Sequence, residues 1–196
     1  MVQKVRGSAM DEMNAESGGQ NALDLAIVPT AALTAATRAE IIAMCNRAFG
    51  DDRFTSFFDY VTDSMHVLGT MDGALVGHAC WTERRLQPEG LSPLRTAYVD
   101  AVAMEPGYQG RGIGSAVMRR LARETAACQL QALSTDDAAG FYERLGWERW
   151  RGPTAGHTPQ GLQATNDLVL IHRTSTTPAL DLTTLLIADD RGGQPW

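Results

Sequence analysis

The sequence is organised around residues 96–115, where an apolar run, a glycine-rich loop and a helical segment follow one another. Residues 98–104, YVDAVAM, are apolar apart from Asp100, and such aromatic and β-branched runs are typical of buried strands. Residues 109–114 read QGRGIG, and residues 115–127 carry good helix formers with apolar residues at helical spacing. The stretch therefore predicts a strand, a glycine loop and a helix, in that order.

This order predicts a binding site for a phosphate group. A helix N-terminus presents unpaired backbone N–H groups and the positive end of the helix dipole. Glycines let a pyrophosphate approach the backbone because they carry no Cβ. A nucleotide P-loop would end in Gly-Lys-Ser/Thr, which is missing, and a dinucleotide-binding loop would need a glycine where Ser115 stands. A tight strand-to-helix turn without a ligand is the plainer alternative.

The length of 196 residues suits one domain with a full core. Residues 1–21 are polar and Gly/Ser-rich near their end, so we expect a loosely ordered extension, followed by a single domain over residues 22–196. No apolar run reaches the length of a membrane span, and the first residues do not resemble a secretion signal. We therefore expect a cytoplasmic protein without a membrane partner.

Charge and residue spacing exclude two classes of partner. The net charge of −6 argues against nucleic acid and is compatible with cationic small molecules. The three cysteines form no CxxC pair, and the four histidines show no metal-ligand spacing. We therefore predict no metal site, and cysteines that are small core residues.

Hydrophobic periodicity predicts an α/β fold, a mixed sheet with helices on both faces. Strands are expected at residues 23–28, 65–70, 74–86, 96–104, 131–134, 147–151, 168–172 and 180–186. Helices are expected at residues 34–49, 53–61, 115–127 and 138–145, the first with Thr34 as its cap and Gly50 as its stop. Residues 152–166 are rich in Gly, Pro and Thr and predict a loop.

Two motifs in the second half of the chain resemble the GNAT acetyltransferases. The acyl-CoA loop of that family reads Gln/Arg-x-x-Gly-x-Gly/Ala, and Gln109, Gly112 and Gly114 match it position by position. Residues 141–147, FYERLGW, resemble the family's Tyr on a short helix followed by a Leu-Gly-Phe/Trp turn. A narrower resemblance to the aminoglycoside 2'-N-acetyltransferases covers residues 22–196 and includes a C-terminal Asp-x-Arg-x-Gly-x-x-Trp.

The resemblance implies a GNAT fold, whose central mixed, mostly antiparallel sheet is splayed between its fourth and fifth strands. It also implies direct transfer of an acetyl group from acetyl-CoA to an amine. The pantetheine arm would pair with Ala101, Val102, Ala103 and Met104. The pyrophosphate would rest on backbone N–H groups of Gln109, Gly110, Arg111, Gly112, Ile113, Gly114 and Ser115.

Direct transfer requires a path for the amine proton, a polarised thioester and an acid for the leaving thiolate. Asp100 stands where the resembled enzymes carry Glu, which implies a water-relayed base; a structural acid at a bulge is the alternative. Tyr142 matches the family's general acid, although it could instead pack at the core edge. The Val102 N–H is the expected donor to the thioester oxygen.

The resemblance assigns substrate binding to Asp52, Phe57, Asp100, Gln194 and Trp196. The terminal carboxylate of Trp196 would reach cationic groups, unless the chain end is frayed. Phe57 and Gln194 stand where the family carries acids, so we expect a more apolar pocket and a substrate with few amines. Kasugamycin is the specific candidate, and its acetylation would confer antibiotic resistance.

Two other functions stay open at this point. One is a GNAT enzyme that acts on another small amine or on a peptide N-terminus. The other is a non-catalytic acyl-CoA-binding module, against which the presence of both Asp100 and Tyr142 argues. A homodimer is expected from the family resemblance only.

Overall fold

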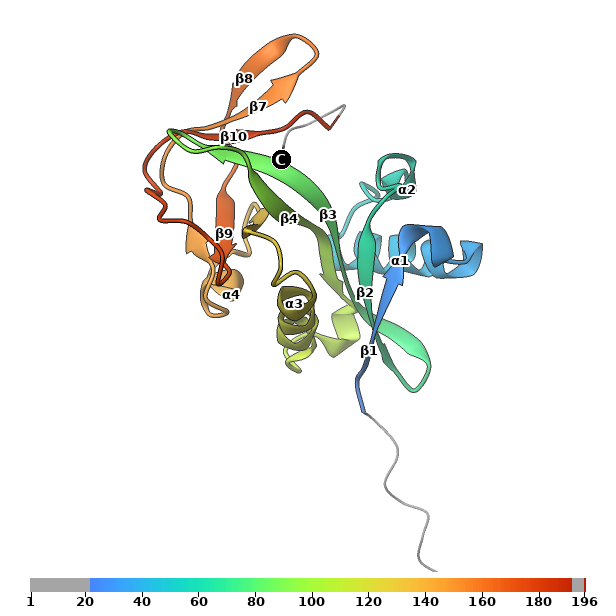
Figure 1. Ribbon diagram of the computed structural model, residues 1–196. Helices are drawn as coiled ribbons and strands as arrows, with labels where there is room; N and C mark the ends of the chain where they lie inside the picture. Colours follow the sequence, from blue (N-terminus) through green and yellow to red (C-terminus); the bar gives the residue numbers. More distant parts are fainter. Residues whose placement is uncertain (1–21, 192–195) are drawn as a thin grey trace, which may run out of the picture.

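The computed structural model describes residues 22–191 and residue 196. Within these residues ten strands form one sheet in the order β6-β9-β5-β4-β3-β10-β7-β8, and β2 and then β1 continue it beside the first half of β3 (Figure 1). The strands are β1 Asp24–Pro29, β2 Met65–Met71, β3 Ala74–Pro88, β4 Leu94–Met104, β5 Leu130–Ser134, β6 Glu148–Arg149, β7 Thr154–Thr158, β8 Gly161–Thr165, β9 Val169–Arg173 and β10 Leu186–Ala188.

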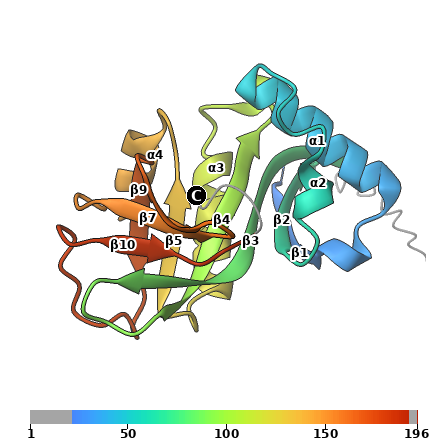
Figure 2. The same ribbon diagram turned by 90° about the horizontal axis from the view of Figure 1, so that it is seen from above.

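Helices cover both faces of this sheet, as predicted (Figure 2). Neighbouring residues of β3 point to opposite faces: Ala79 packs in a buried cluster with α3, whereas Cys80 packs in one with α1. None of the helices in the described residues is long and apolar enough to cross a membrane. The helical elements there are α1 Ala35–Phe49, α2 Phe57–Tyr60, α3 Ile113–Glu124 and α4 Ala139–Glu143, with 3-10 turns η1 Thr30–Ala32 and η2 Pro106–Tyr108.

The sheet is splayed between β4 and β5. The two strands pair in parallel only from Thr96 to Tyr98, opposite Leu130 to Ala132. Beyond this point β5 continues its pairing with β9 on its other side. In the described part of the chain no strand lies beside the β5-facing edge of β4 from residue 99 to residue 104. The splay expected from the sequence is confirmed.

A bulge interrupts the pairing of β4 with β3 at the same level. The register passes from Cys80 opposite Asp100 to His78 opposite Ala103, so one residue of β3 faces two of β4. Ala101, inside the bulge, has a φ of +51°. This left-handed conformation costs a non-glycine residue roughly 1–2 kcal/mol, so neighbouring contacts have to hold the peptide in place.

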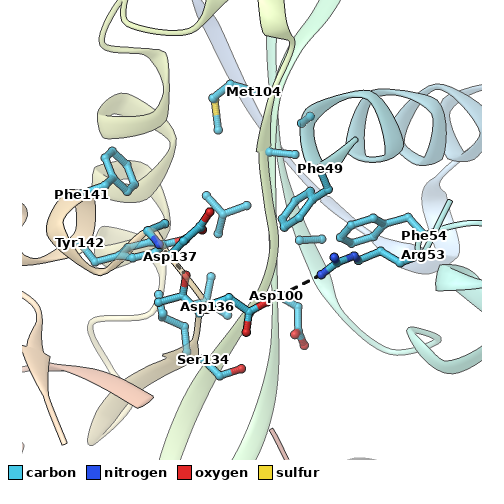
Figure 3. Close-up of a pocket in the computed structure, with 18 of the residues that line it drawn as sticks. Phe49, Arg53, Phe54, Asp100, Met104, Ser134, Asp136, Asp137, Phe141 and Tyr142 are labelled. Carbon is cyan, nitrogen blue, oxygen red and sulfur yellow. Dashed lines mark hydrogen bonds and ion pairs between the residues drawn. The ribbon is translucent and has the colours of Figure 1, made fainter. Parts of the chain in front are cut away.

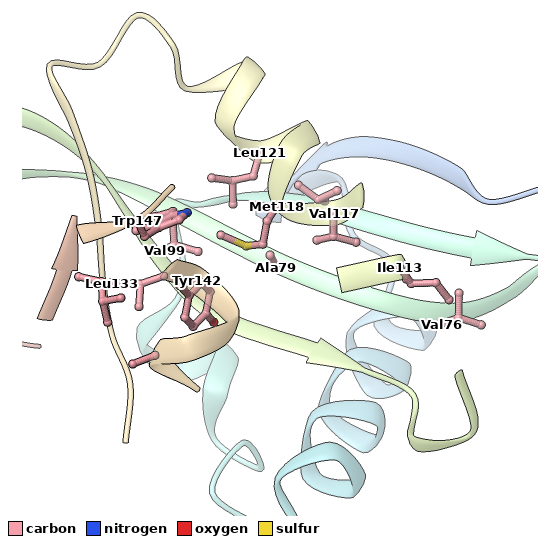
Figure 4. Packing of buried hydrophobic residues seen from close by; sticks show 13 residues of the cluster. Val76, Ala79, Val99, Ile113, Val117, Met118, Leu121, Leu133, Tyr142 and Trp147 are labelled. Carbon is pink, nitrogen blue, oxygen red and sulfur yellow. The ribbon is translucent and has the colours of Figure 1, made fainter. Parts of the chain in front are cut away.

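The packing of α3 fixes the position of the glycine loop that precedes it. One stripe of this amphipathic helix is buried against β3 and β4 (Figure 4). The facing residues are Ile113, Val117, Met118 and Leu121 on α3, and Val76, Ala79 and Val99 on the strands. Since the helix cannot slide without opening this core, its N-terminus stays beside the end of β4.

The first helix and the first hairpin confirm the sequence-based predictions. Thr34 caps α1 by accepting a hydrogen bond from the Thr37 N–H at 3.1 Å, and Gly50 ends the helix with a φ of +75°. The turn between β2 and β3 falls at residues 72–73, between the strands expected at residues 65–70 and 74–86. Cys45, Cys80 and Cys128 are buried, as expected of small core residues.

Three predicted elements are wrong. The helix expected at residues 53–61 spans only Phe57–Tyr60, because the Thr55, Phe57 and Asp59 N–H groups donate to the carbonyl three residues earlier, in tight turns, and not to the one four residues earlier. The loop expected at residues 152–166 contains the hairpin β7–β8, and the strand expected at residues 180–186 forms at Leu186–Ala188. The extension predicted for residues 1–21 lies outside the described residues.

Candidate active site

A cavity of about 810 Å3 lies where β4 and β5 part (Figure 3). Backbone forms one side of it: the open edge of β4, residues 99–104, continued by Gln109 and Gly110. We term this edge, together with loop residues 109–115, the main-chain wall. Because the β4 edge lacks a strand beside it in the described part of the chain, its N–H and C=O groups can pair with an extended ligand.

The main-chain wall ends at the N-terminus of α3. Gly112 is the N-cap of this helix with a φ of +81°, and no side chain caps it. Gly110 also has a positive φ, +74°, and a Cβ on either glycine would meet no atom within 4 Å. Backbone conformation, rather than crowding, therefore requires glycine at both positions. The first N–H groups of the helix have no partner within it, so an anion can bind there.

Side chains from separate segments form most of the remaining lining, and we term them the side-chain wall. They come from α1, the α1–α2 loop, α2, the β5–α4 loop, the segment before β9, and the last residue. They are Phe49, Arg53, Phe54, Phe57, Tyr60, Asp136, Asp137, Asp167 and Trp196. Arg53 Nη1 lies 3.9 Å from Asp136 Oδ2 in an exposed ion pair, which links two of these segments across the cavity (Figure 3).

Tyr142, the predicted general acid, lines the same cavity from α4. Its side chain is 6% exposed and packs against the rings of Phe141 and Trp147, with centroid distances of 5.0 and 5.8 Å. Burial, and secondarily the charge of Asp137, raises the pKa of Tyr142 above its ordinary value. The site thus contains a tyrosine that is protonated at neutral pH.

Asp100, the predicted base, forms an ion pair with the C-terminal segment. Its Oδ2 lies 3.4 Å from Arg191 Nη1, and the side chains are 26% and 24% exposed. Burial raises the pKa of Asp100, while the charges of Arg191 and Arg84 lower it. Arg191 therefore favours the ionised form of this carboxylate, whereas burial opposes it.

The C-terminal segment is anchored beside the cavity. Arg84 Nε donates to Asp189 Oδ1 at 2.7 Å, and Arg84 also lies over the Tyr98 ring at 4.8 Å. Trp196 is 9% exposed, with its ring centroid 6.3 Å from that of Tyr98. A frayed end does not describe Trp196, which is part of the cavity lining. The role expected for its carboxylate stays a prediction.

The other predicted substrate residues are distributed unevenly. Phe57 lines the cavity at 1% exposure, within an aromatic cluster. Asp52 is exposed and is not part of the lining, whereas its neighbour Arg53 is. Gln194 lies outside the described residues. Within the loop, the Ile113 side chain is buried in the core, so only the backbone of this residue can serve a ligand.

Sequence reasoning missed three acids of the side-chain wall: Asp136, Asp137 and Asp167. They lie in loops without periodicity, and the available signal was that Asp136 and Asp137 closely follow β5, at the splay. The cavity therefore holds more carboxylates than the replacement of acids at Phe57 and Gln194 led us to expect. Among the described residues no group of His, Cys, Asp and Glu could hold a metal ion.

Comparison with known proteins agrees with this geometry. A model of the acetyltransferase (GNAT) family matches residues 35–147, more than half of the chain. An aminoglycoside 2'-N-acetyltransferase of Mycolicibacterium fortuitum is 34% identical over 177 residues, which cover 87% of this chain and 90% of that protein.

Solved structures share the fold. The GNAT family N-acetyltransferase YhbS from Escherichia coli, in complex with CoA, matches with a TM-score of 0.61 at 14% identity, over 91% of this chain and 95% of that one. An acyl-CoA N-acyltransferase from Pseudomonas aeruginosa matches with a TM-score of 0.56 at 16% identity, over 77% and 99% of the two chains. Splayed sheet, glycine loop and family match agree: the chain belongs to the GNAT family of acetyltransferases.

Proposed function

We propose that this N-acetyltransferase uses acetyl-CoA to acetylate the 2'-amine of an aminoglycoside antibiotic, and thereby confers resistance. The observation that carries the proposal is that one cavity at the splay is lined by the open edge of β4, by Asp100 on that strand and by Tyr142 of α4. The 34% identity to an aminoglycoside 2'-N-acetyltransferase supports the choice of acceptor.

The main-chain wall fits acetyl-CoA. The amide groups of a pantetheine arm would pair with the backbone of residues 101–104 as an added strand, and the pyrophosphate would meet the N–H groups at the start of α3. Bound acetyl-CoA supplies an acetyl thioester, and its transfer to an amine forms an amide, breaks the C–S bond, removes one proton from nitrogen and delivers one to sulfur.

Two side chains handle these protons. The neutral Tyr142 hydroxyl donates a proton to the leaving sulfur, which matches its raised pKa. Asp100, whose ionised form the charge of Arg191 favours, accepts the amine proton through a water molecule; its side chain is shorter than the Glu of the resembled enzymes, which fits a relayed role. Both groups line the cavity.

The side-chain wall favours a cationic acceptor. Three carboxylates, Asp136, Asp137 and Asp167, stand against one guanidinium, that of Arg53. Kasugamycin is the narrower candidate, and it rests on Phe57 and Gln194 standing where the resembled enzymes carry acids. Trp196, the last residue, is part of the cavity lining. A peptide substrate would need an open groove, so this position of the chain end disfavours one.

Thiol release from acetyl-CoA tests the proposal with five acceptors: kasugamycin, gentamicin, tobramycin, spermidine and a short peptide. We expect turnover with aminoglycosides, kasugamycin first, and NMR of the product should place the acetyl group on the 2'-amine. Broad turnover of the multi-amine drugs would overturn the preference for kasugamycin and leave the aminoglycoside assignment standing. Binding of acetyl-CoA without acetylation of any aminoglycoside would overturn the acceptor assignment.

A further inference from the structure

A chain of hydrogen bonds lies in the core behind the β4 bulge. Thr30 Oγ1 lies 2.9 Å from His66 Nε2, His66 Nδ1 lies 2.9 Å from His78 Nε2, and His78 Nδ1 lies 2.8 Å from the Ala101 carbonyl oxygen. Both histidines are 0% exposed. The proton transfers described above use neither of them, so their burial requires another explanation.

The number of protons on the two rings decides which atom donates and which accepts in these hydrogen bonds. Burial lowers the pKa of His66 to about 4 and that of His78 to about 3, so each ring is neutral at pH 7 and carries one proton. The Ala101 carbonyl can only accept, so the His78 proton is on Nδ1. His78 Nε2 then accepts from His66 Nδ1–H, and the unprotonated His66 Nε2 faces the Thr30 hydroxyl, which also donates to the Ser64 carbonyl oxygen. Each of the two hydrogen bonds of the His78 ring therefore contains one proton.

The last link orients one peptide of the bulge. Ala101 has a φ of +51°, and the register of β3 and β4 skips over Ala101 and Val102. The peptide between them is trans, so its C=O and N–H point in opposite directions. Because His78 holds the Ala101 C=O on the core side, the Val102 N–H points away from the histidines, and Val102 lines the cavity.

We propose that His66 and His78 are positioning residues for acetyl transfer: they lock the 101–102 peptide so that the Val102 N–H donates a hydrogen bond to the oxygen of the bound thioester. The inference rests on the proposed function, since it requires an acyl thioester beside β4. A donor fixed before the reaction stabilises negative charge on that oxygen without reorganising.

Two substitutions at one position separate positioning from packing. His78→Leu fills the space and removes the donor to Ala101. His78→Asn places an amide N–H at the δ position, where the imidazole Nδ1–H stood, and is the matched control. We expect kcat to fall on the order of 10-fold to 100-fold in the Leu variant, with the Kd for CoA unchanged, and to recover largely in the Asn variant.

Infrared spectroscopy provides a readout that packing alone would not change. With acetyl-CoA labelled by 13C at the carbonyl and no acceptor present, a hydrogen bond from Val102 lowers the carbonyl stretching frequency relative to free acetyl-CoA. We expect this shift in wild type and in His78→Asn, and its loss in His78→Leu. A folded Leu variant that keeps both the shift and kcat would overturn the inference.

A third measurement covers the case in which the Leu variant does not fold. Long-range 1H–15N NMR of the wild-type protein identifies the tautomer of each ring. We expect Nδ1–H at both histidines, and Nε2–H at His78 would overturn the inference. Failure of the proposed function looks different: if no aminoglycoside is acetylated, the carbonyl shift and its dependence on His78 remain. If acetyl-CoA does not bind, both proposals fail.

Discussion

The main-chain wall and the side-chain wall of the cavity are built in opposite ways. The main-chain wall comes from one continuous stretch, residues 99–115, and presents backbone groups held by a helix, two glycines and a bulge. The side-chain wall comes from distant segments and presents aromatic rings and carboxylates on helix ends and loops. Backbone recognition suits a coenzyme that does not change, whereas exchangeable side chains suit an acceptor that differs between relatives.

The walls also differ in what holds them. A hydrophobic cluster on α3 and a buried histidine pair support the main-chain wall from behind. The side-chain wall is joined by exposed contacts such as Arg53–Asp136, where the side chains are 53% and 94% exposed. Exposed ion pairs contribute typically less than about 1 kcal/mol. Changes to the main-chain wall should therefore affect stability and every acceptor, and changes to the side-chain wall should affect only some acceptors.

The largest expected effect concerns stability at acid pH. Between about pH 6.5 and pH 4 the unfolded chain protonates His66 and His78, whereas the fold keeps them neutral. Each histidine then lowers the free energy of unfolding by up to about 1.4 kcal/mol per pH unit as the pH falls. Above pH 6.5 this contribution is constant. Urea unfolding at pH 7.5, 6.5, 5.5 and 4.5 measures it.

The double variant His66→Leu/His78→Leu is the control. It removes both histidines at once, so no buried imidazole is left without its partner. We expect a flatter pH dependence for it over the same range. The contribution of Asp100 to the pH dependence of stability has the opposite sign. Because its pKa is raised in the folded protein, the folded state binds more protons at this group than the unfolded state, so its contribution to the free energy of unfolding falls as the pH rises. Equal slopes in wild type and double variant would show that the histidines are not the source.

The next largest effect is expected for Tyr142→Phe, which tests the role of Tyr142 as general acid. Loss of a general acid lowers rates by about 100-fold to 10,000-fold, so we expect kcat to fall at least about 100-fold with every acceptor. The Kd for CoA and the Tm should not change, because the ring stays packed against Phe141 and Trp147. Tyr60→Phe, on the side-chain wall, is the matched control and should lose less than about 5-fold. Similar losses in both variants would remove Tyr142 from its assigned role.

Gly112→Ala tests the main-chain wall with an expected effect of about 10-fold, the equivalent of about 1.4 kcal/mol of backbone strain. At a φ of +81° alanine is strained, and relief of that strain would turn the first N–H groups of α3 away from the ligand. We expect a higher Kd for CoA, whichever acceptor is present.

Gly90→Ala controls for strain itself. Gly90 has a φ of +78° in the β3–β4 turn and, like Gly112, has no atom within 4 Å of an added Cβ. Calorimetric titration with CoA should show no change in this variant. An equal loss of CoA affinity in both variants would mean that general destabilisation, not loop geometry, is responsible.

The same contrast explains how far sequence reasoning reached. The strand, the glycine loop and the helix of the main-chain wall were predicted, because they adjoin in the chain and each has a local pattern. The helix expected at residues 53–61 was wrong because the backbone there forms tight turns, with hydrogen bonds to the carbonyl three residues earlier. The hairpin β7–β8 was missed because its weak alternation gains support only from β10, through pairing with a segment some thirty residues away.

Contacts between distant residues were beyond reach for a similar reason. Asp100 and Arg191 are 91 positions apart, and nothing in either stretch specifies their pairing. The histidine pair did leave a signal. With the turn correctly placed, the β2–β3 register sets His66 opposite Cys80, so His78, two residues from Cys80, lies on the same face. Their shared burial could have been predicted, but their link to Ala101 depends on the bulge.

The smallest expected effect belongs to the acids of the side-chain wall. Asp136→Asn and Asp167→Asn each remove one exposed charge from the cavity, so we expect KM for an aminoglycoside to rise only about 2-fold to 3-fold, with kcat and the Kd for CoA unchanged. The rise should be larger for gentamicin than for kasugamycin, which has fewer amines, and should shrink in high salt because the charges are screened. Asp63→Asn, between α2 and β2 and outside the cavity lining, removes the same charge as a control. An equal rise in KM for the Asp63 variant would show that the net charge of −6 attracts the acceptor, and that the side-chain wall does not select it by position.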